Sequence, residues 1–210
     1  MVWATFTQLK LWKRERRREL ITETARELFA QKAFKEVTVR EIARAAGVSV
    51  GTIYNYYSSV GELFVDVFLK NGREIIQLMD EALEDKSPGT FKRVCQAYIR
   101  YLCGNITFFQ IMSHFIIGGV LSEDARPQLN ECMRAVMDRF EKTVRLAGIH
   151  TNTRIAAHTL FCALNGIMIS YIRDPDGISD ELKQHTARLT DKMASIFESY
   201  NPPADPARIQ

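Results

Sequence analysis

The sequence predicts an all-α protein, with a small N-terminal head of three helices and a larger helical domain after it. Apolar residues recur at three- and four-residue spacing along most of the chain, and no segment alternates with period two for the length of a strand. Helix caps and stop signals divide the chain into about nine helices. Its 210 residues, 46% hydrophobic and 25% charged, are enough for a small head and a larger core.

The first helix is predicted over about residues 13–32, after a flexible arm of residues 1–12. It opens with the basic run KRERRR at residues 13–18. Residues 1–60 contain 11 Lys and Arg against 6 Asp and Glu, whereas the rest of the chain has a small acidic excess within a total charge of +3. The run is open to two interpretations, a solvated helix turn or a contact with phosphate groups. The apolar face of this helix consists of Leu20, Ile21, Thr24, Ala25, Leu28 and Phe29.

Residues 38–57, TVREIARAAGVSVGTIYNYY, predict two short helices joined by a tight turn. Thr38 and Glu41 form a T-x-x-E capping box that starts the first of them. Gly47 supplies the left-handed residue that ends this helix without a Cβ clash. Together with the first helix, this pair forms a head of three helices.

Ser49 is a suitable N-cap for the second helix of the pair, which is predicted over residues 50–57 and is called the reader helix below. Only Ile53 and Tyr57 in it have the spacing of buried residues. Its other positions are small, hydroxylated, amide or aromatic, which is typical of a helix that is read by a partner. A helix-turn-helix places such a helix in the major groove of DNA, and a neighbouring basic run then favours phosphate contact.

Six further helices are predicted after the head. Ser59 and Glu62 form a second capping box, which opens a long helix to about residue 84 and leads into the second domain, residues 61–200. Ser87 and Pro88 predict the next helix start, and Gly104 its end. The remaining helices are expected over about residues 106–117, 122–147, 151–173 and 179–200, with a disordered tail at residues 201–210.

The run EVTVREIARAAGVSVGTIYNYYSSVGELF resembles the DNA-binding segment of the tetracycline-repressor (TetR) family of bacterial transcription regulators. The resemblance covers roughly residues 14–64, and beyond it only length and architecture are similar. It implies an all-helical homodimer that binds a double-stranded DNA operator and represses a promoter until a small molecule binds the second domain. The family commonly has Lys at the position of Val60 and Lys or Arg at that of Val50, and both charges are missing here.

The resemblance also implies which residues contact DNA. Arg40 is expected to pair with guanine and Asn55 with adenine, and Val50 or the Thr52 methyl group to meet a thymine methyl group. Tyrosine hydroxyl groups are equally suited to phosphate. The complete set of expected DNA-binding residues is Arg14, Arg17, Arg40, Ser49, Val50, Gly51, Thr52, Tyr54, Asn55 and Tyr56.

The second domain is rich in large aromatic and methionine side chains, which favours a pocket for a small apolar or aromatic effector. Plain hydrophobic core is the alternative interpretation. Gln110, His114, Cys162 and Asn165 are the polar candidates for orienting a ligand. The expected ligand-binding residues are Tyr98, Tyr101, Phe109, Met112, His114, Phe115, Met137, Phe140, Phe161, Cys162, Asn165 and Met168.

The last two helices, helices 8 and 9, are expected to form the homodimer interface as a four-helix bundle across a two-fold axis. A monomer that buries both helices internally is the alternative. The side of helix 8 expected at the interface contains Ala156, Ala157, Leu160, Ala163, Leu164, Ile167 and Tyr171.

Several classes of protein are disfavoured. The sequence has no G-x-S-x-G, P-loop or Rossmann motif, so we expect neither an enzyme nor a bound cofactor. His158 and Cys162, one helix turn apart, are too few for a metal site. Without an apolar run of about 18 residues or a signal peptide, the expected location is the cytoplasm and no membrane is involved. A helical small-molecule binding protein with a vestigial head is the alternative function.

Overall fold

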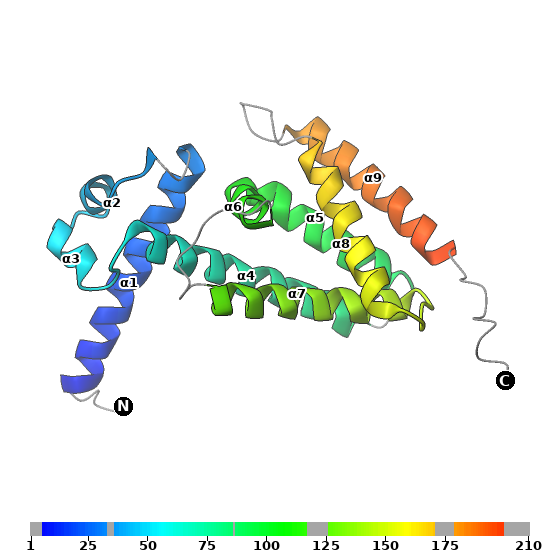
Figure 1. Cartoon of the computed structure of the whole chain (residues 1–210), viewed down its shortest axis with the longest axis horizontal. Helices are drawn as coiled ribbons and strands as arrows, with labels where there is room; N and C mark the ends of the chain where they lie inside the picture. Colours follow the sequence, from blue (N-terminus) through cyan, green and yellow to red (C-terminus); the bar gives the residue numbers. More distant parts are fainter. Residues whose placement is uncertain (1–5, 33–35, 86, 117–125, 171–178, 200–210) are drawn as a thin grey trace. The chain divides into compact units, whose positions relative to one another are not determined.

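The computed structural model describes residues 6–32, 36–85, 87–116, 126–170 and 179–199. Within these ranges it contains nine helices and no strand, which confirms the predicted all-α fold (Figure 1). The helices are α1 Phe6–Gln31, α2 Val39–Ala45, α3 Val50–Tyr54, α4 Val60–Glu84, α5 Thr90–Gly104, α6 Ile106–Ile116, α7 Arg126–Leu146, α8 Thr153–Ile169 and α9 Asp180–Ser199.

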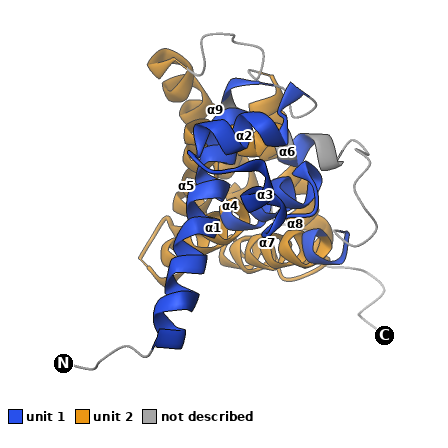
Figure 2. Ribbon diagram, turned by 90° about the vertical axis from the view of Figure 1, so that its left-hand side faces the viewer, with its two compact units in different colours: residues 1–70, 111–129 blue, residues 71–110, 130–210 orange. Residues whose placement is uncertain are grey.

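The chain forms two compact units (Figure 2). The first consists of residues 1–70 and 111–129, and the second of residues 71–110 and 130–210. The first unit extends beyond the domain boundary expected at residue 60, because the beginning of α4 belongs to the core of the head. Phe64 of α4 is buried, and its ring packs edge-on against Phe29 of α1 at 5.3 Å between centroids.

The expected flexible arm is wrong for residues 6–12, which form the first turns of α1. This stretch, FTQLKLW, contains neither Gly nor Pro and no capping signal before Lys13, so nothing in it ends the helix. Every residue from 6 to 20 is exposed, Phe6 to 75% and Trp12 to 61%. Burial begins at Ile21, where α1 enters the core of the head.

Two other predicted starts differ from the structure. The helix expected at Ser87 begins at Thr90, after Gly89 with φ of 86°. The Thr90 hydroxyl donates to the Ser87 carbonyl oxygen at 2.7 Å, so Ser87 belongs to a turn before the helix. Helix α8 begins at Thr153, after Asn152 with a left-handed backbone (φ 51°). The start expected at residue 122 and the tail 201–210 lie outside the described residues.

The core of the second unit forms where α5 packs against both α8 and α9. Phe91 of α5 stacks on Phe197 of α9 at 6.1 Å between ring centroids. An ion pair of 2.8 Å between Lys92 and Asp191 joins the same two helices at their surface. Helix α9 is therefore held mainly by α5.

Candidate nucleic-acid interface

Helix α2 is fixed at both ends by local hydrogen bonds. The Thr38 hydroxyl accepts from the Glu41 backbone N–H at 3.3 Å, and the Glu41 carboxylate accepts from the Thr38 N–H at 3.0 Å, which confirms the capping box. Gly47 ends the helix with φ of 64°, a conformation that disfavours any residue with a Cβ. Lys32, directly after α1, binds the Glu41 carboxylate at 2.5 Å and lowers the pKa of that group to about 2.

The reader helix is α3, Val50–Tyr54, and it is shorter than the predicted residues 50–57. The Ser49 hydroxyl caps it by accepting from the Thr52 N–H at 3.0 Å. Tyr56 and Tyr57 follow in a tighter turn, in which both N–H groups donate to the Ile53 carbonyl oxygen. Ile53 and Tyr57 are 1% and 2% exposed, so the two residues expected to anchor the helix are buried.

The exposed face of the reader helix carries five of the expected DNA-binding residues, if its flanking residues are included. Val50, Gly51, Tyr54 and Asn55 are exposed, as is Ser49, and Arg40 is exposed on α2. Because these side chains and the Gly51 backbone reach solvent from two adjoining helices, they are accessible to the edges of bases in a groove.

Four of the expected residues already have partners within the protein. The Thr52 hydroxyl lies 2.8 Å from that of Ser49, so both hydroxyl groups take part in the helix cap. Tyr56 is half-buried, and the Arg14 guanidinium lies over its ring at 5.8 Å from the centroid. Arg14 of the basic run is thus placed beside the end of the reader helix.

The arginines of the basic run differ in their surroundings. Arg16 pairs with Glu19 at 3.0 Å on the surface of α1, and Arg17 is exposed. Arg18 instead binds Asp66 of α4 at 2.9 Å. Asp66 was not among the predicted site residues, although a carboxylate between buried apolar residues of α4 is unusual.

The predicted ligand-binding residues of the second unit include a closed aromatic cluster. Tyr98 packs edge-on against Phe140 at 4.9 Å between centroids, and Phe140 against Phe161 at 5.9 Å. The Asn165 amide donates to the Tyr98 hydroxyl at 3.2 Å and to the Phe161 carbonyl oxygen at 2.8 Å. Complete burial raises the pKa of Tyr98, so its hydroxyl group stays protonated.

The other predicted ligand residues divide into three groups. Cys162 is exposed on α8, so the prediction that its thiol points into the same site as Asn165 is wrong. The side chains of His114 and Phe115 lie outside the described part of the structure. Four residues are buried in the second unit, namely Tyr101, Phe109, Met137 and Met168, while Met112 is buried and belongs to the first unit.

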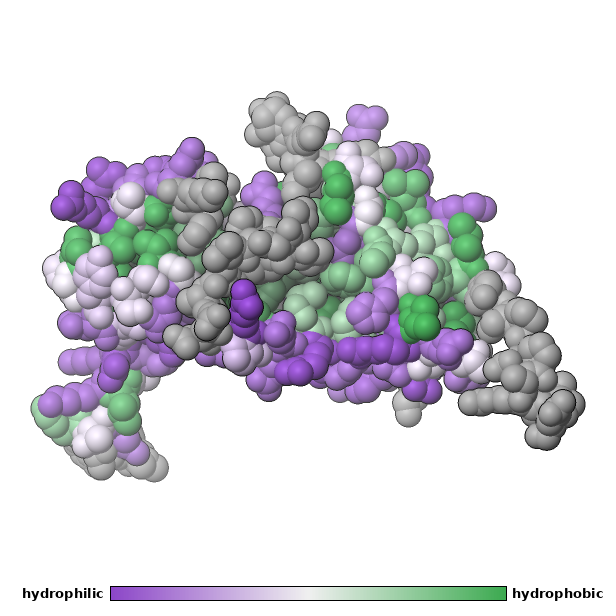
Figure 3. All heavy atoms as spheres, in the orientation of Figure 1, coloured by the Kyte–Doolittle hydropathy of each residue, from purple (hydrophilic) through white to green (hydrophobic). Residues whose placement is uncertain are grey.

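Helix α8 buries part of the side that was expected at the dimer interface. Ala157, Leu160 and Leu164 are fully buried within the second unit, because they face its core. The exposed side follows a spacing of four and three residues, and apolar surface is visible over α8 and α9 in Figure 3. We call this side the α8 stripe; it consists of Ile155, Thr159, Cys162, Gly166 and Ile169.

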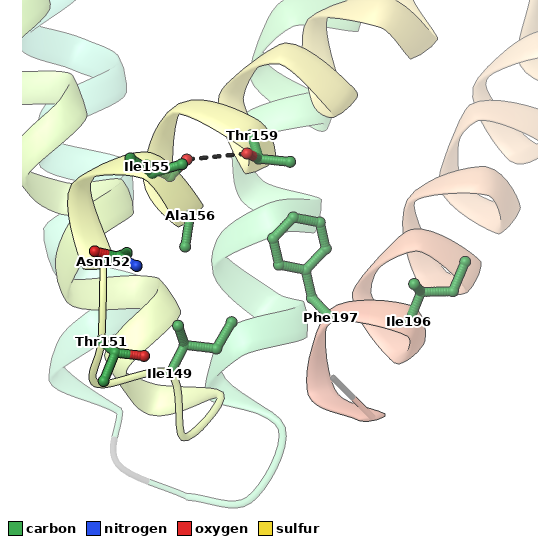
Figure 4. Close-up of a pocket in the computed structure, with 8 residues that line it drawn as sticks. All are labelled: Ile149, Thr151, Asn152, Ile155, Ala156, Thr159, Ile196 and Phe197. Carbon is green, nitrogen blue, oxygen red and sulfur yellow. Dashed lines mark hydrogen bonds between the residues drawn. The ribbon is translucent and has the colours of Figure 1, made fainter. Parts of the chain in front are cut away.

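A pocket of about 380 Å³ lies beside the α8 stripe, between the start of α8 and the end of α9 (Figure 4). Ile155 is 68% exposed and Ile196 of α9 58% exposed, so the mouth of the pocket is apolar. The Thr159 hydroxyl donates a hydrogen bond to the Ile155 carbonyl oxygen at 2.9 Å, so its polar group is satisfied within α8. None of the lining residues was among the predicted ligand contacts.

The described residues offer neither a metal site nor a membrane span. Those residues contain no group of three or more His, Cys, Asp and Glu side chains arranged to hold a metal ion. His158 is exposed like Cys162, so the two share one side of α8 facing solvent. No helix among them is long and apolar enough to cross a membrane.

Comparison with known sequences identifies the head. Residues 21–67 match the model of the bacterial regulatory proteins of the tetR family. The HTH-type transcriptional regulator YhgD of Bacillus subtilis, itself uncharacterized, is 38% identical over 72 residues, 34% of this chain and 38% of YhgD. The HTH-type transcriptional regulator AlkX of Mycobacterium tuberculosis is 25% identical over 196 residues, 89% of each chain. The match to YhgD, which has the higher identity of the two, thus spans less than half of the length of YhgD.

Solved structures share the fold over most of the chain. The transcriptional regulator FadR of Bacillus subtilis, solved in complex with stearoyl-CoA, superposes with a TM-score of 0.70 at 18% identity, over 86% of this chain and 97% of FadR. The TetR-family regulator PfmR of Thermus thermophilus gives 0.67 at 20% identity, over 83% and 97%. These relatives are named as regulators, in agreement with the prediction that the chain is not an enzyme. The head thus matches the tetR family of bacterial regulatory proteins over residues 21–67, and most of the chain shares its helical fold with the solved TetR-family regulator PfmR.

Proposed function

We propose that this chain is a homodimeric, ligand-responsive repressor that binds a pseudo-palindromic DNA operator in the cytoplasm. The observation that carries the proposal is the exposed face of the reader helix. Ile53 and Tyr57 anchor the segment from behind, whereas Val50, Tyr54 and Asn55 reach solvent. A buried back and an exposed polar and aromatic front are what a helix needs to enter a major groove.

The exposed residues suggest how bases are read. Arg40 has the donor geometry for the two acceptors of guanine, and Asn55 for the donor and acceptor of adenine. Val50 offers an apolar contact to a thymine methyl group. Gly51 lets the backbone approach closely, and Tyr54 and Tyr56 have hydroxyl groups suited to phosphate.

The second copy is proposed to bind through α8 and α9. One reader helix makes too few base contacts for selective binding, so two are expected on successive major grooves, about 34 Å apart. The α8 stripe is exposed and contains Gly166 and Thr159, which allow another helix to approach closely. Ile155 and Ile196 at the mouth of the neighbouring pocket add apolar surface that a partner would cover.

The effector is proposed to be a small, largely hydrophobic molecule. The rings of Tyr98, Phe140 and Phe161 contact one another, so a ligand that inserts among them has to separate them. Helix α4 contributes residues to both units, and it is the proposed route by which this rearrangement reaches the head. A coupling free energy of about 1–3 kcal/mol is sufficient to release an operator.

The test uses the full-length protein and a random duplex library. We expect the wild-type protein to enrich a two-fold symmetric sequence and to sediment as a dimer. Stearoyl-CoA is the first effector probe, because the similar fold of B. subtilis FadR was solved with it. Release of the enriched duplex by this probe, measured by fluorescence anisotropy, supports a ligand-responsive repressor. Enrichment of no sequence at all would refute the proposal.

One observation favours a second candidate, a helical small-molecule binding protein with weak DNA binding. Val50 and Val60 stand where the resemblance implies basic residues, so two phosphate or base contacts are missing. Retention on duplex DNA that decreases steeply with salt separates the two functions, because a vestigial head releases few counterions.

A further inference from the structure

Four side chains from three segments of the head meet in one hydrogen-bonded group, which we call the Asp66 cluster. It consists of Arg18 and Thr22 of α1, Tyr57 after the reader helix, and Asp66 of α4. The Tyr57 hydroxyl donates to Asp66 Oδ2 at 2.5 Å and lies 2.8 Å from the Thr22 hydroxyl oxygen. The cluster therefore ties the end of the reader segment to both supporting helices.

Arg18 and Asp66 form a two-point pair within this cluster. Arg18 Nη2 donates to Asp66 Oδ1 at 2.9 Å, and Nε donates to Oδ2 at 3.2 Å. The same Nε lies 3.2 Å from the Tyr57 hydroxyl oxygen. The Asp66 side chain is only 19% exposed, against 45% for Arg18. Such bidentate pairing fixes the orientation of the guanidinium plane as well as its position.

The hydroxyl group of Tyr57 is not needed for packing. A phenylalanine ring would fill the same space, and a buried hydroxyl is costly unless it is hydrogen-bonded. Burial, followed by the hydrogen bond to Asp66, raises the pKa of Tyr57 to about 12, so at neutral pH the hydroxyl keeps the proton that it donates. A buried polar group whose partners come from three segments specifies one arrangement of those segments.

We infer that Asp66 is a positioning residue for DNA recognition, which holds the reader helix in one orientation and withholds Arg18 from DNA phosphate groups. This inference rests on the proposed function, because it concerns how that function's reader helix is presented. The inference assigns different roles to two adjacent arginines. Exposed Arg17 binds DNA phosphate groups, whereas Arg18 helps to hold the reader helix in its orientation within the head.

The first test measures affinity at several salt concentrations for the duplex enriched by the wild-type protein and for a scrambled duplex. Arg17→Gln is the matched control, and we expect it to weaken both duplexes and to lower the salt slope by up to about 0.9. Arg18→Gln and Tyr57→Phe should keep the wild-type slope, whereas Asp66→Asn should not lower it, because this substitution releases Arg18 and removes no positive charge. Each should reduce the ratio of enriched to scrambled affinity about fivefold, the equivalent of one lost hydrogen bond.

The second test needs no DNA and measures hydrogen exchange of the backbone amides of the reader helix in the free protein. Asp66→Asn and Tyr57→Phe should speed this exchange, while exchange in the second unit stays as in the wild type. If Asp66→Asn does not fold, hydrogen exchange in Tyr57→Phe tests the inference. If no duplex is enriched, the proposed function fails, and hydrogen exchange alone tests whether the Asp66 cluster holds the reader helix. A slope lowered equally by Arg18→Gln and Arg17→Gln, or exchange unchanged in Tyr57→Phe, overturns the inference.

Discussion

The reader helix and the aromatic cluster of the second unit use the same kind of side chain in opposite ways. Tyr54 on the reader helix is 55% exposed, whereas Tyr98 of α5 is completely buried and bonded to Asn165. The first ring is therefore available to a partner molecule, and the second contributes to the stability of its own unit. The comparison teaches that aromatic content alone does not indicate binding, because burial decides what a ring does.

Removing each ring in turn tests whether the buried ring stabilises the fold and the exposed ring does not. Tyr98→Ala should lower the free energy of unfolding by about 3–5 kcal/mol, since it leaves a cavity beside Phe140 and deprives Asn165 of a partner. Tyr54→Ala, the matched control, should change it by no more than about 0.5 kcal/mol. Urea denaturation measures both. A loss below about 1 kcal/mol for Tyr98→Ala would mean that its ring is not well packed.

The next test concerns function at the exposed surface. Arg40→Ala and Asn55→Ala should each cost about 1–3 kcal/mol in affinity for the enriched duplex and relax the preference at one base position. Both residues are exposed, so the unfolding free energy should stay near that of the wild type. Affinities for the enriched and scrambled duplexes are compared. Equal losses on the two would show that these residues contact only the DNA backbone.

The same contrast explains what could be predicted from the sequence. The capping box of Thr38 with Glu41 and the Ser49 cap join residues three positions apart, so sequence spacing alone located both. The buried positions Ile53 and Tyr57 likewise followed from the helical period. For these reasons the helices of the head were largely predicted, apart from the length of α1, the exposure of Leu20 and the end of the reader helix.

Features that depend on distant parts of the chain were not predictable in this way. In the Asp66 cluster, Arg18 binds Tyr57, which is 39 positions away, and Asp66, which is 48 positions away. No local sequence pattern predicts contacts over such separations. Cys162 was expected in a ligand site because the second domain is rich in large aromatic and methionine side chains, but packing of α8 against α5 and α9 determines which side of that helix faces inward. Burial direction in a helix that is apolar all round is a tertiary property.

A smaller effect is expected at the turn between α2 and the reader helix. Gly47→Ala places a Cβ at φ of 64°, which should cost about 1–2 kcal/mol of unfolding free energy although no atom lies within 4 Å. Gly104→Ala is the control, because its surroundings are equally open and its φ is not positive. It should be neutral or stabilise by up to about 1 kcal/mol. Equal effects of both substitutions would show that the turn does not constrain its backbone.

The smallest expected effect is the pH dependence contributed by Glu41 to the reader's support. Its pKa is lowered to about 2, chiefly by the hydrogen bond from Lys32, so its contribution to stability is present above the ordinary glutamate pKa of 4.5. That contribution should be lost as the pH falls from there toward 2, because protonation removes the negative charge that Lys32 and the Thr38 N–H bind. We therefore expect the urea midpoints of the wild type and Glu41→Gln to differ at pH 7 and to converge near pH 2. Lys32→Met should reduce that difference at pH 7, and a gap that is the same at both pH values would show that the carboxylate charge contributes nothing to the fold of the head.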